Sequence, residues 1–148
     1  MEWITAVVAL YGAILSTISI IETRKVKQRK VVVKFSSGFV CGLVDPGPFR
    51  IFLTASNPGY RSVTLTQPGI ILPDGKTIVF LDLQSNVNFP HELLEGKSCT
   101  VWVDANEIAQ RLRANGFKGE VKLVAFFRDA LDTKYISKLM KFNIDEEY

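Results

Sequence analysis

The chain begins with one long apolar segment and continues as short segments in which apolar and polar residues alternate. From Trp3 to Ile21 there are 19 residues without a charge, and a helix of this length reaches about 28 Å, close to one hydrocarbon core. We therefore expect residues 1–22 to form a single transmembrane helix. Its Thr, Ser and Gly residues keep the gain from insertion small, so a helix buried in a soluble core or against a partner is the alternative.

A basic segment at residues 23–30 follows the apolar run, whereas Glu2 is the only charged side chain before it. Basic residues near a span are retained in the cytoplasm, so we expect the N-terminus outside the cell membrane and the rest of the chain inside. A cleaved signal peptide would need basic residues before the run and a small-residue cleavage site after it, which favours an uncleaved anchor. The side chains expected to contact lipid headgroups are Arg24, Lys25, Lys27, Arg29 and Lys30.

Small residues recur along one face of the expected helix at spacings of four, three, four, three and four. Small side chains let two helices approach closely in lipid and allow hydroxyl hydrogen bonds between them. This seam predicts association with a second copy or with another membrane helix, although a helix rich in small residues also produces such a seam by chance. Its members are Thr5, Ala9, Gly12, Ser16, Ser19 and Thr23.

The chain after residue 30 reads as mostly β. Short β-branched segments alternate in polarity and are separated by Gly, Pro, Asn and Asp, which is typical of strands joined by turns. The segment QPG at 67–69 predicts a break between two strands, and PDGK at 73–76 predicts a tight hairpin turn. We expect strands at 31–35, 49–56, 62–66, 70–72, 77–83, 98–103, 120–128 and 134–144.

One helix is predicted between these strands, from Ala105 to Ala114. Asp104 can cap its N-terminus, Glu107 occupies the capping-box position, and Gly116 can end it in a left-handed conformation. We interpret it as a crossover between two sheets. The expected fold is an immunoglobulin-like β-sandwich of seven to eight strands in one domain at residues 31–148, with a small closed barrel as the alternative.

Three segments resemble a known kind of module. They are LTASNPGYRSVTL at 53–65, LPDGK at 72–76 and FFRDA at 126–130. The first is similar to the turn and strand signature of bacterial immunoglobulin-like β-sandwich modules. With the N-terminal helix, the chain resembles small prokaryotic single-pass membrane proteins of uncharacterised function that carry such a domain. The resemblance implies a fold and no activity, because turn motifs are shared by many functions.

The charge distribution argues against nucleic-acid binding. The formal net charge is +3, but six of the 18 basic residues lie between Arg24 and Lys34. Residues 35–148 hold 12 basic and 13 acidic side chains and are nearly neutral. A domain that neutralises phosphates needs a basic face, so we expect no nucleic-acid partner.

Candidate catalytic chemistry is sparse. His91 is the only histidine, and we place it in a loop; Cys41 and Cys99 are the only cysteines, and reduced thiols are expected in the cytoplasm. Cys99 and His91 could form a nucleophilic pair, but a buried, inert Cys99 is favoured, because Cys99, Val101 and Val103 occupy the inward positions of a predicted strand. We expect no catalytic, cofactor-binding or metal-binding residues, and hence a protein that is not an enzyme.

Two aromatic residues are candidates for partner binding. If the odd positions of 121–127 face inward, Phe126 faces outward, and Trp102 likewise lies opposite its inward neighbours. The two could mark an apolar patch for a protein partner, or they could be covered by the helix at 105–114 or by the segment next to the membrane. The leading hypothesis is a membrane-anchored, non-enzymatic module that recruits a protein partner. The alternative is an effector that oligomerises through its N-terminal helix and perturbs the bilayer.

Overall fold

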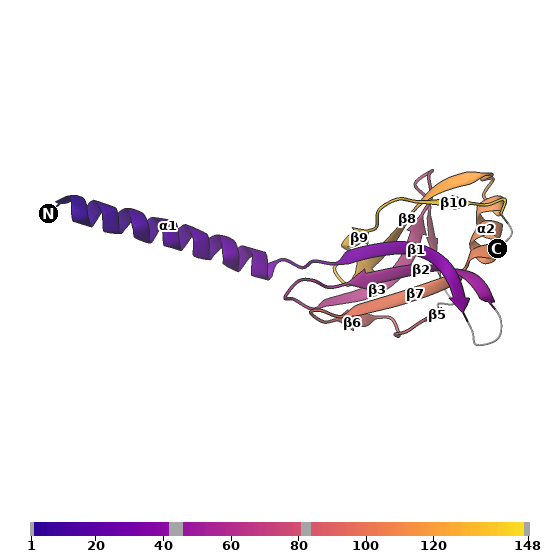
Figure 1. Cartoon of the computed structure of the whole chain (residues 1–148), viewed down its shortest axis with the longest axis horizontal. Coiled ribbons are helices and arrows are strands. Elements are labelled where there is room, and N and C mark those ends of the chain that lie inside the picture. The colour runs from indigo at the N-terminus through magenta and orange to yellow at the C-terminus, as the bar shows by residue number, and fades with distance from the viewer. Residues whose placement is uncertain (1, 42–45, 81–83, 147–148) are drawn as a thin grey trace.

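A computed structural model of the chain describes residues 2–41, 46–80 and 84–146. Helix α1 (Glu2–Lys27) projects from a β-rich body, which it joins through residues 28–31 (Figure 1). Its segment Trp3–Arg24 has a mean hydropathy of 2.2 and is long and apolar enough to cross a membrane. None of this segment is buried against the rest of the chain, so α1 is not a core helix of this fold. Membrane anchors and signal sequences share these properties.

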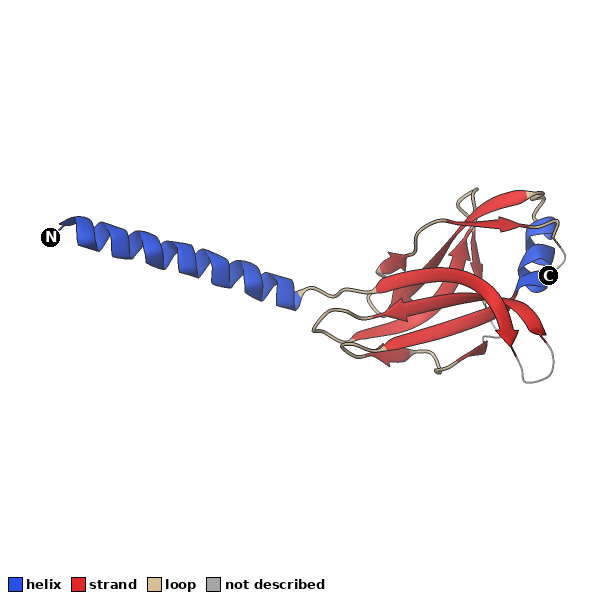
Figure 2. Cartoon of the chain, viewed as in Figure 1, coloured by secondary structure: helices blue, strands red, loops and turns tan. Residues whose placement is uncertain are grey.

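The body consists of two open antiparallel sheets, which Figure 2 shows as two layers. The described residues form ten strands, more than the seven to eight expected, and the mostly β prediction is confirmed. One sheet has the order β1 (Val32–Cys41), β2 (Pro46–Ser56), β7 (Ser98–Asp104) and β5 (Gln84–Ser85). The other has the order β10 (Met140–Asn143), β8 (Glu120–Asp129), β3 (Val63–Ile71) and β4 (Thr77–Val79), with β6 (His91–Leu93) beside β3 and β9 (Lys134–Ile136) beside β8.

The core lies between the two sheets and contains side chains from both. Strand alternation places it, because every second residue of a strand faces the same side. In β2 the inward positions Ile51, Leu53 and Ala55 are completely buried, as the sequence pattern predicted. Leu65 of β3 and Leu123 of β8 face them from the other sheet within the same cluster. Burial of these side chains is the main source of stability for the body.

Helix α2 (Ala105–Ala114) has the predicted bounds and connects β7 of one sheet to β8 of the other. The Asp104 carboxylate accepts a hydrogen bond from the Asn106 amide at 2.8 Å, which caps the helix. Ile108 and Leu112 are fully buried, and Gly116 has a φ of +86° just beyond the helix. The predicted crossover helix is therefore confirmed.

The predicted break at residues 67–69 is wrong, because β3 runs continuously from Val63 to Ile71. The pairing of β3 with β8 shifts register between Leu65 and Gln67, which absorbs the irregularity as a bulge. On its other side β3 pairs with β6 at residues 63–65 and with β4 at residues 69–71. Pro68 falls between these two pairings, where its missing amide hydrogen costs no described ladder bond.

The predicted strand at 134–144 is divided into β9 and β10. Ser137 causes the division, because its hydroxyl accepts a hydrogen bond from the Ala125 amide at 2.9 Å, in the place of a backbone carbonyl. The Ser137 amide in turn donates to the Ala125 carbonyl at 2.8 Å. His91 also differs from its prediction, since it lies in β6 and pairs with Leu65. Residues 81–83 of the predicted strand 77–83 lie outside the described residues.

Candidate functional site

A groove of about 720 Å³ lies where one edge of each sheet meets the other. One wall is the first part of β1 with the residue before it, Val31–Ser36, and the other is the segment Ile136–Met140, apart from Ser137. Exposed apolar side chains form its rim: Val32 is 40% exposed, Ile136 62% and Leu139 54%. Exposed apolar patches of this kind mark sites of interaction with a protein, a membrane or a ligand.

The floor of the groove is continuous with the core. Val33 is buried, and Val31, Phe35 and Met140 are half-buried and pack against the core cluster. The rim side chains are therefore mounted on strands whose positions the core fixes. A site built on rigid elements loses little conformational entropy on binding.

The charged residues of the groove are both basic. Lys34 stands on the β1 side and Lys138 on the opposite side, and the lining contains no acidic residue. Both lysines are exposed. The groove therefore combines apolar contact with positive charge, which favours a ligand with apolar and carboxylate groups.

The backbone of β1 is a further binding element. β1 is the edge strand of its sheet and pairs with β2 from Val32 to Cys41. Within the described residues no strand pairs with its other side. An edge strand presents unpaired amide and carbonyl groups to which an extended peptide can add as a further strand.

The two aromatic residues proposed as one partner patch do not lie together. Trp102 belongs to β7 and Phe126 to β8, which are strands of different sheets. Trp102 is half-buried, and its indole Nε1 donates to Gln84 Oε1 at 2.9 Å. A role for Trp102 in binding stays a prediction.

The expectation that Phe126 is exposed is wrong, since only 1% of its surface is accessible. Its ring lies against Gly69 of the neighbouring strand, where an added Cβ would come within 2.6 Å of the ring. Lys134 lies on the neighbouring strand β9, and its ammonium group is 5.2 Å from the centre of the Phe126 ring. Gly69 leaves room for the Phe126 ring, and the aliphatic part of the Lys134 side chain covers it. Burial of Phe126 therefore does not require α2 or the segment next to the membrane.

The seam residues of α1, from Thr5 to Thr23, are all exposed. The Thr23 hydroxyl donates to the Ser19 carbonyl at 2.8 Å, so it is satisfied within the helix. Of the predicted headgroup residues, Arg24, Arg29 and Lys30 are exposed, and the side chains of Lys25 and Lys27 lie outside the described set. Their roles in helix packing and lipid contact stay predictions.

The Cys99 thiol is an unfavourable nucleophile. It is completely buried on β7, and burial raises its pKa to about 11, only partly offset by a hydrogen bond with the Ala55 backbone. A thiol with a raised pKa is almost entirely protonated at neutral pH. Cys41 is an exposed free thiol at the end of β1. Within residues 2–41, 46–80 and 84–146, no three His, Cys, Asp or Glu side chains are placed to hold a metal ion.

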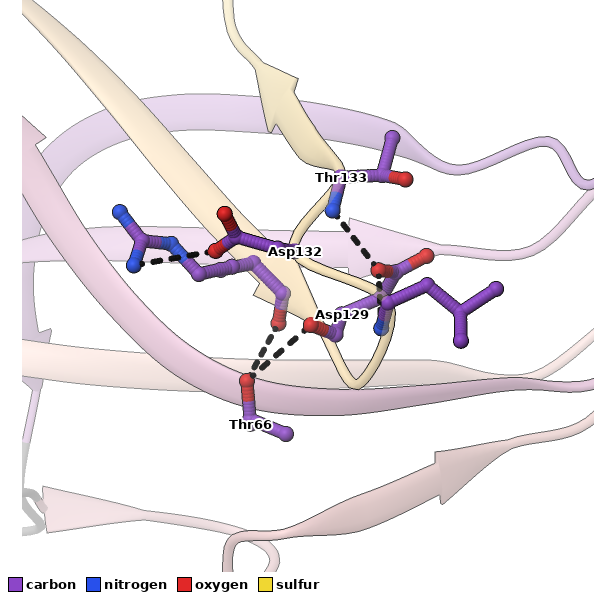
Figure 3. Close-up of polar contacts among 6 residues, drawn as sticks. Thr66, Asp129, Asp132 and Thr133 are labelled. Atoms are coloured by element: carbon purple, nitrogen blue, oxygen red, sulfur yellow. Dashed lines mark hydrogen bonds and ion pairs between the residues drawn. The ribbon is translucent and has the colours of Figure 1, made fainter.

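A second, shallower hollow of about 510 Å³ borders the turn between β8 and β9. Figure 3 shows its polar contacts: the Thr66 hydroxyl donates to the Arg128 carbonyl at 3.1 Å, and the Arg128 guanidinium forms an ion pair with Asp132 at 3.2 Å. The Asp129 carboxylate accepts from the amide of Thr133 at 2.9 Å. These contacts hold the turn in one conformation and leave the hollow with charges of both signs.

The Asp129 side chain is the centre of this turn. It is only 3% exposed and also accepts from the Leu131 amide at 2.9 Å and from the Tyr135 hydroxyl at 3.0 Å. Burial alone raises the pKa of Asp129, but the hydrogen bonds from Thr133, Tyr135 and Leu131 and the charge of Arg29 outweigh it, so this pKa lies below its usual 3.8. Burial and the bond to Asp129 raise the pKa of Tyr135 to about 12.

Sequence reasoning missed the groove, because its two walls are far apart in the chain. The apolar residues Ile136 and Leu139 gave a signal, because they would point to opposite faces of one uninterrupted strand at 134–144 and a single inward face cannot bury both. Their place opposite β1 depends on the packing of the two sheets, which no local pattern specifies.

No protein-family model and no curated protein sequence matches this chain. Among solved structures, the chain is similar to the secreted serine protease VesC from Vibrio cholerae at 14% identity and a TM-score of 0.38, over 76% of this chain and 23% of that one. It is also similar to Northeast Structural Genomics Consortium target SoR45 at 12% identity and a TM-score of 0.31, over 77% of this chain and 85% of that one. At these TM-scores neither likeness supports a statement about activity.

Proposed function

We propose that this chain is a single-pass membrane protein whose β domain binds a protein partner at the cytoplasmic face of the cell membrane without catalysing a reaction. The exposed apolar surface of Trp3–Arg24 supports the anchor, because such a surface is unfavourable in water. The basic residues from Arg24 to Lys30, on the side of the domain, support the orientation. The two antiparallel sheets joined by α2 support an immunoglobulin-like sandwich.

The groove between β1 and residues 136–140 carries the proposal of partner binding. It joins an exposed apolar rim to a free strand edge within one site. The partner is an extended segment that adds to the β1 edge and alternates apolar with acidic side chains, because Lys34 and Lys138 provide the only charges of the lining. The linker of residues 28–31 keeps this site close to the membrane, so partners in the same membrane or at its surface are favoured.

The contribution of the rim can be estimated from exposure. Ile136 and Leu139 are 62% and 54% exposed, and complete burial of such a side chain is worth about 1.5–3 kcal/mol. Covering the exposed part of both therefore contributes about 2–3 kcal/mol. Loss of this contribution corresponds to about a 30- to 150-fold increase in Kd.

Selection of displayed peptides against the full-length protein in nanodiscs tests the proposal. We expect enrichment of segments that alternate apolar and acidic residues, together with slower amide exchange in residues 32–36 when such a peptide is bound. The double variant Ile136→Ser, Leu139→Ser should weaken binding, and Phe39→Ser should not, since Phe39 is equally exposed at 60% but lies outside the groove. Peptides that bind the double variant as tightly as the parent protein would contradict the proposal.

The second candidate function is an effector that assembles through α1 and perturbs the bilayer. It is supported by the seam from Thr5 to Thr23, which is exposed along its whole length. The double variant Gly12→Leu, Ser16→Leu should abolish crosslinking between copies in the membrane, whereas Ala13→Leu, Thr17→Leu on another face of the helix should preserve it. Equal crosslinking in both double variants would exclude the seam as an assembly surface.

A further inference from the structure

Three loop tips of the folded domain carry large exposed apolar side chains. Tyr60 in the loop between β2 and β3 is 66% exposed, Leu94 in the loop between β6 and β7 is 50% exposed, and Leu131 in the turn between β8 and β9 is 67% exposed. None of them lines the groove between β1 and residues 136–140. Single exposed apolar residues are common on protein surfaces, so what matters is whether these three gather at one place.

Strand register places the three tips at the end of the domain from which α1 emerges. Ser56 at the end of β2 pairs with both Val32 at the start of β1 and Ser98 at the start of β7. Leu65 of β3 pairs with His91 of β6 and with Asp129 at the end of β8. The loops that follow or precede these residues therefore leave the same end, and Figure 1 shows this end turned toward α1, with α2 at the opposite end.

One buried polar side chain ties two of the three tips to each other. Asn57 is 1% exposed, and its amide group donates to the carbonyls of Arg61 at 2.7 Å and Leu93 at 2.9 Å. The Asn57 backbone also bonds to Lys97 and Gly96, so the loop of Tyr60 and the loop of Leu94 form one unit. A surface held in place before binding loses little entropy when it binds.

The turn of Leu131 is fixed in a similar way. The Asp129 carboxylate accepts the amides of Leu131 and Thr133 (Figure 3), and the Ala130 amide donates to the Thr64 carbonyl at 2.9 Å. The Leu131 side chain thus projects from a closed turn whose backbone groups are already paired. The hydrogen bonds of this turn therefore hold the Leu131 side chain in an exposed position.

The charge around the tips is positive. The positive charge of Arg29 contributes to lowering the pKa of Asp129, so Arg29 lies near the turn of Leu131. Lys30 lies beside Gly59 in the loop of Tyr60, since a Cβ added to Gly59 would be 3.3 Å from the Lys30 Cβ. The four residues between the end of α1 and β1 span at most about 13 Å, which holds the tips within reach of the headgroup layer. In the sequence, the basic residues of the segment 22–30 and of the loops and strand ends at this end are Arg24, Lys25, Lys27, Arg29, Lys30, Arg61, Lys97 and Lys134, and the acidic ones are Glu22, Glu92, Glu95, Asp129 and Asp132.

We propose that Tyr60, Leu94 and Leu131 contact the surface of the bilayer that α1 spans, and that the basic side chains around them bind anionic lipid headgroups. Tyrosine and leucine at loop tips can enter the interface while the lysine and arginine side chains remain at headgroup level. The domain is then seated on the membrane by two kinds of contact, helix and tips, and the groove is held in a fixed orientation to the bilayer. The inference rests on the anchoring proposed above.

Lipid quenching of a fluorophore on the full-length protein in nanodiscs tests it. In a Cys41→Ser background, which leaves only the buried Cys99, a fluorophore is placed at Ala130 beside the tip or at Gln110 on the exposed face of α2. Nanodiscs contain phosphatidylcholine with phosphatidylglycerol and a headgroup-labelled nitroxide lipid. We expect quenching at residue 130 at least twofold stronger than at residue 110, and stronger than in nanodiscs of phosphatidylcholine alone.

The triple variant Tyr60→Ser, Leu94→Ser, Leu131→Ser should lose at least half of the quenching at residue 130, while the control Phe39→Ser keeps it. Far-ultraviolet circular dichroism verifies that each variant is folded. Equal quenching at residues 130 and 110, or an unaffected triple variant, would overturn the inference; equal quenching in both lipid mixtures would overturn its anionic-headgroup part. A third fluorophore at Ala13, read with an acyl-chain nitroxide, reports on the anchor, so failure of the anchor is distinguishable from failure of the tips.

Discussion

Replacement of Asp129 by asparagine tests whether a buried charge holds the turn that presents Leu131. The carboxylate accepts hydrogen bonds from the Leu131 and Thr133 amides and from the Tyr135 hydroxyl, each at 2.9–3.0 Å. Asparagine keeps one oxygen for the amides, but these bonds lose their charge, and its amide nitrogen faces the Tyr135 hydroxyl. A bond to a charged group contributes about 1.5–3 kcal/mol and a neutral one about 1 kcal/mol, so we expect a loss on the order of 2–3 kcal/mol.

Urea unfolding of the full-length protein in detergent micelles measures this loss. Trp3 and Trp102 are the only tryptophans, so the Trp3→Phe background reports on the β domain alone. With a slope of about 1.5 kcal/mol per molar urea, the midpoint should fall by about 1.5 M. Asp132→Asn is the matched control: the Asp132 side chain of the ion pair with Arg128 is 81% exposed, and a pair screened in this way by solvent is worth about 1 kcal/mol or less.

The pH dependence of stability provides an independent test of the role of Asp129. The pKa of Asp129 is lowered by folding from its usual 3.8, so the folded protein favours the charged form and gains stability above that pH. The difference between the parent protein and Asp129→Asn should be constant from about pH 5 to 7 and shrink as the pH falls below about 4. A variant as stable as the parent at pH 7, or a difference that grows in acid, would refute the assignment of this carboxylate.

Two further predictions concern the packing of Gly69 against Phe126 and the reactivity of the two cysteine thiols. Gly69→Ala should lower the free energy of unfolding by about 1–3 kcal/mol, because the new Cβ would lie 2.6 Å from the Phe126 ring, whereas Gly38→Ala, with its nearest atom at 4.0 Å, should be neutral in the same urea assay. Cys41 should react rapidly with a maleimide in the folded protein and Cys99 only on unfolding, as the exposure of one and the burial of the other require; mass spectrometry of digested protein measures both, and early labelling of Cys99 would contradict its place in the core.

Local sequence signals predicted the parts of the fold that short-range chemistry determines. Helix α2 has its predicted bounds because Asp104 and Gly116 act within one turn of its ends. The inward alternation of Ile51, Leu53 and Ala55 was read correctly because it depends only on strand periodicity.

Features that depend on pairing between distant residues were not predicted. The burial of Phe126 requires Gly69 on a neighbouring strand, and the division of the last strand requires Ser137 to replace a backbone acceptor for Ala125. The groove was missed for the same reason, since its walls meet only when the sheets pack. The loop tips likewise meet only through the registers of several strands.

Photocrosslinking in the cells that produce this protein tests the central claim, that the groove beside β1 binds a protein partner at the membrane. A photoreactive amino acid is placed at Lys138 in the groove or at Gln110 on α2, both of which are exposed. We predict a discrete adduct with another membrane-associated protein from residue 138, none from residue 110, and loss of the adduct in the Ile136→Ser, Leu139→Ser variant. Absence of an adduct at residue 138, or an adduct that the double variant retains, would contradict the account.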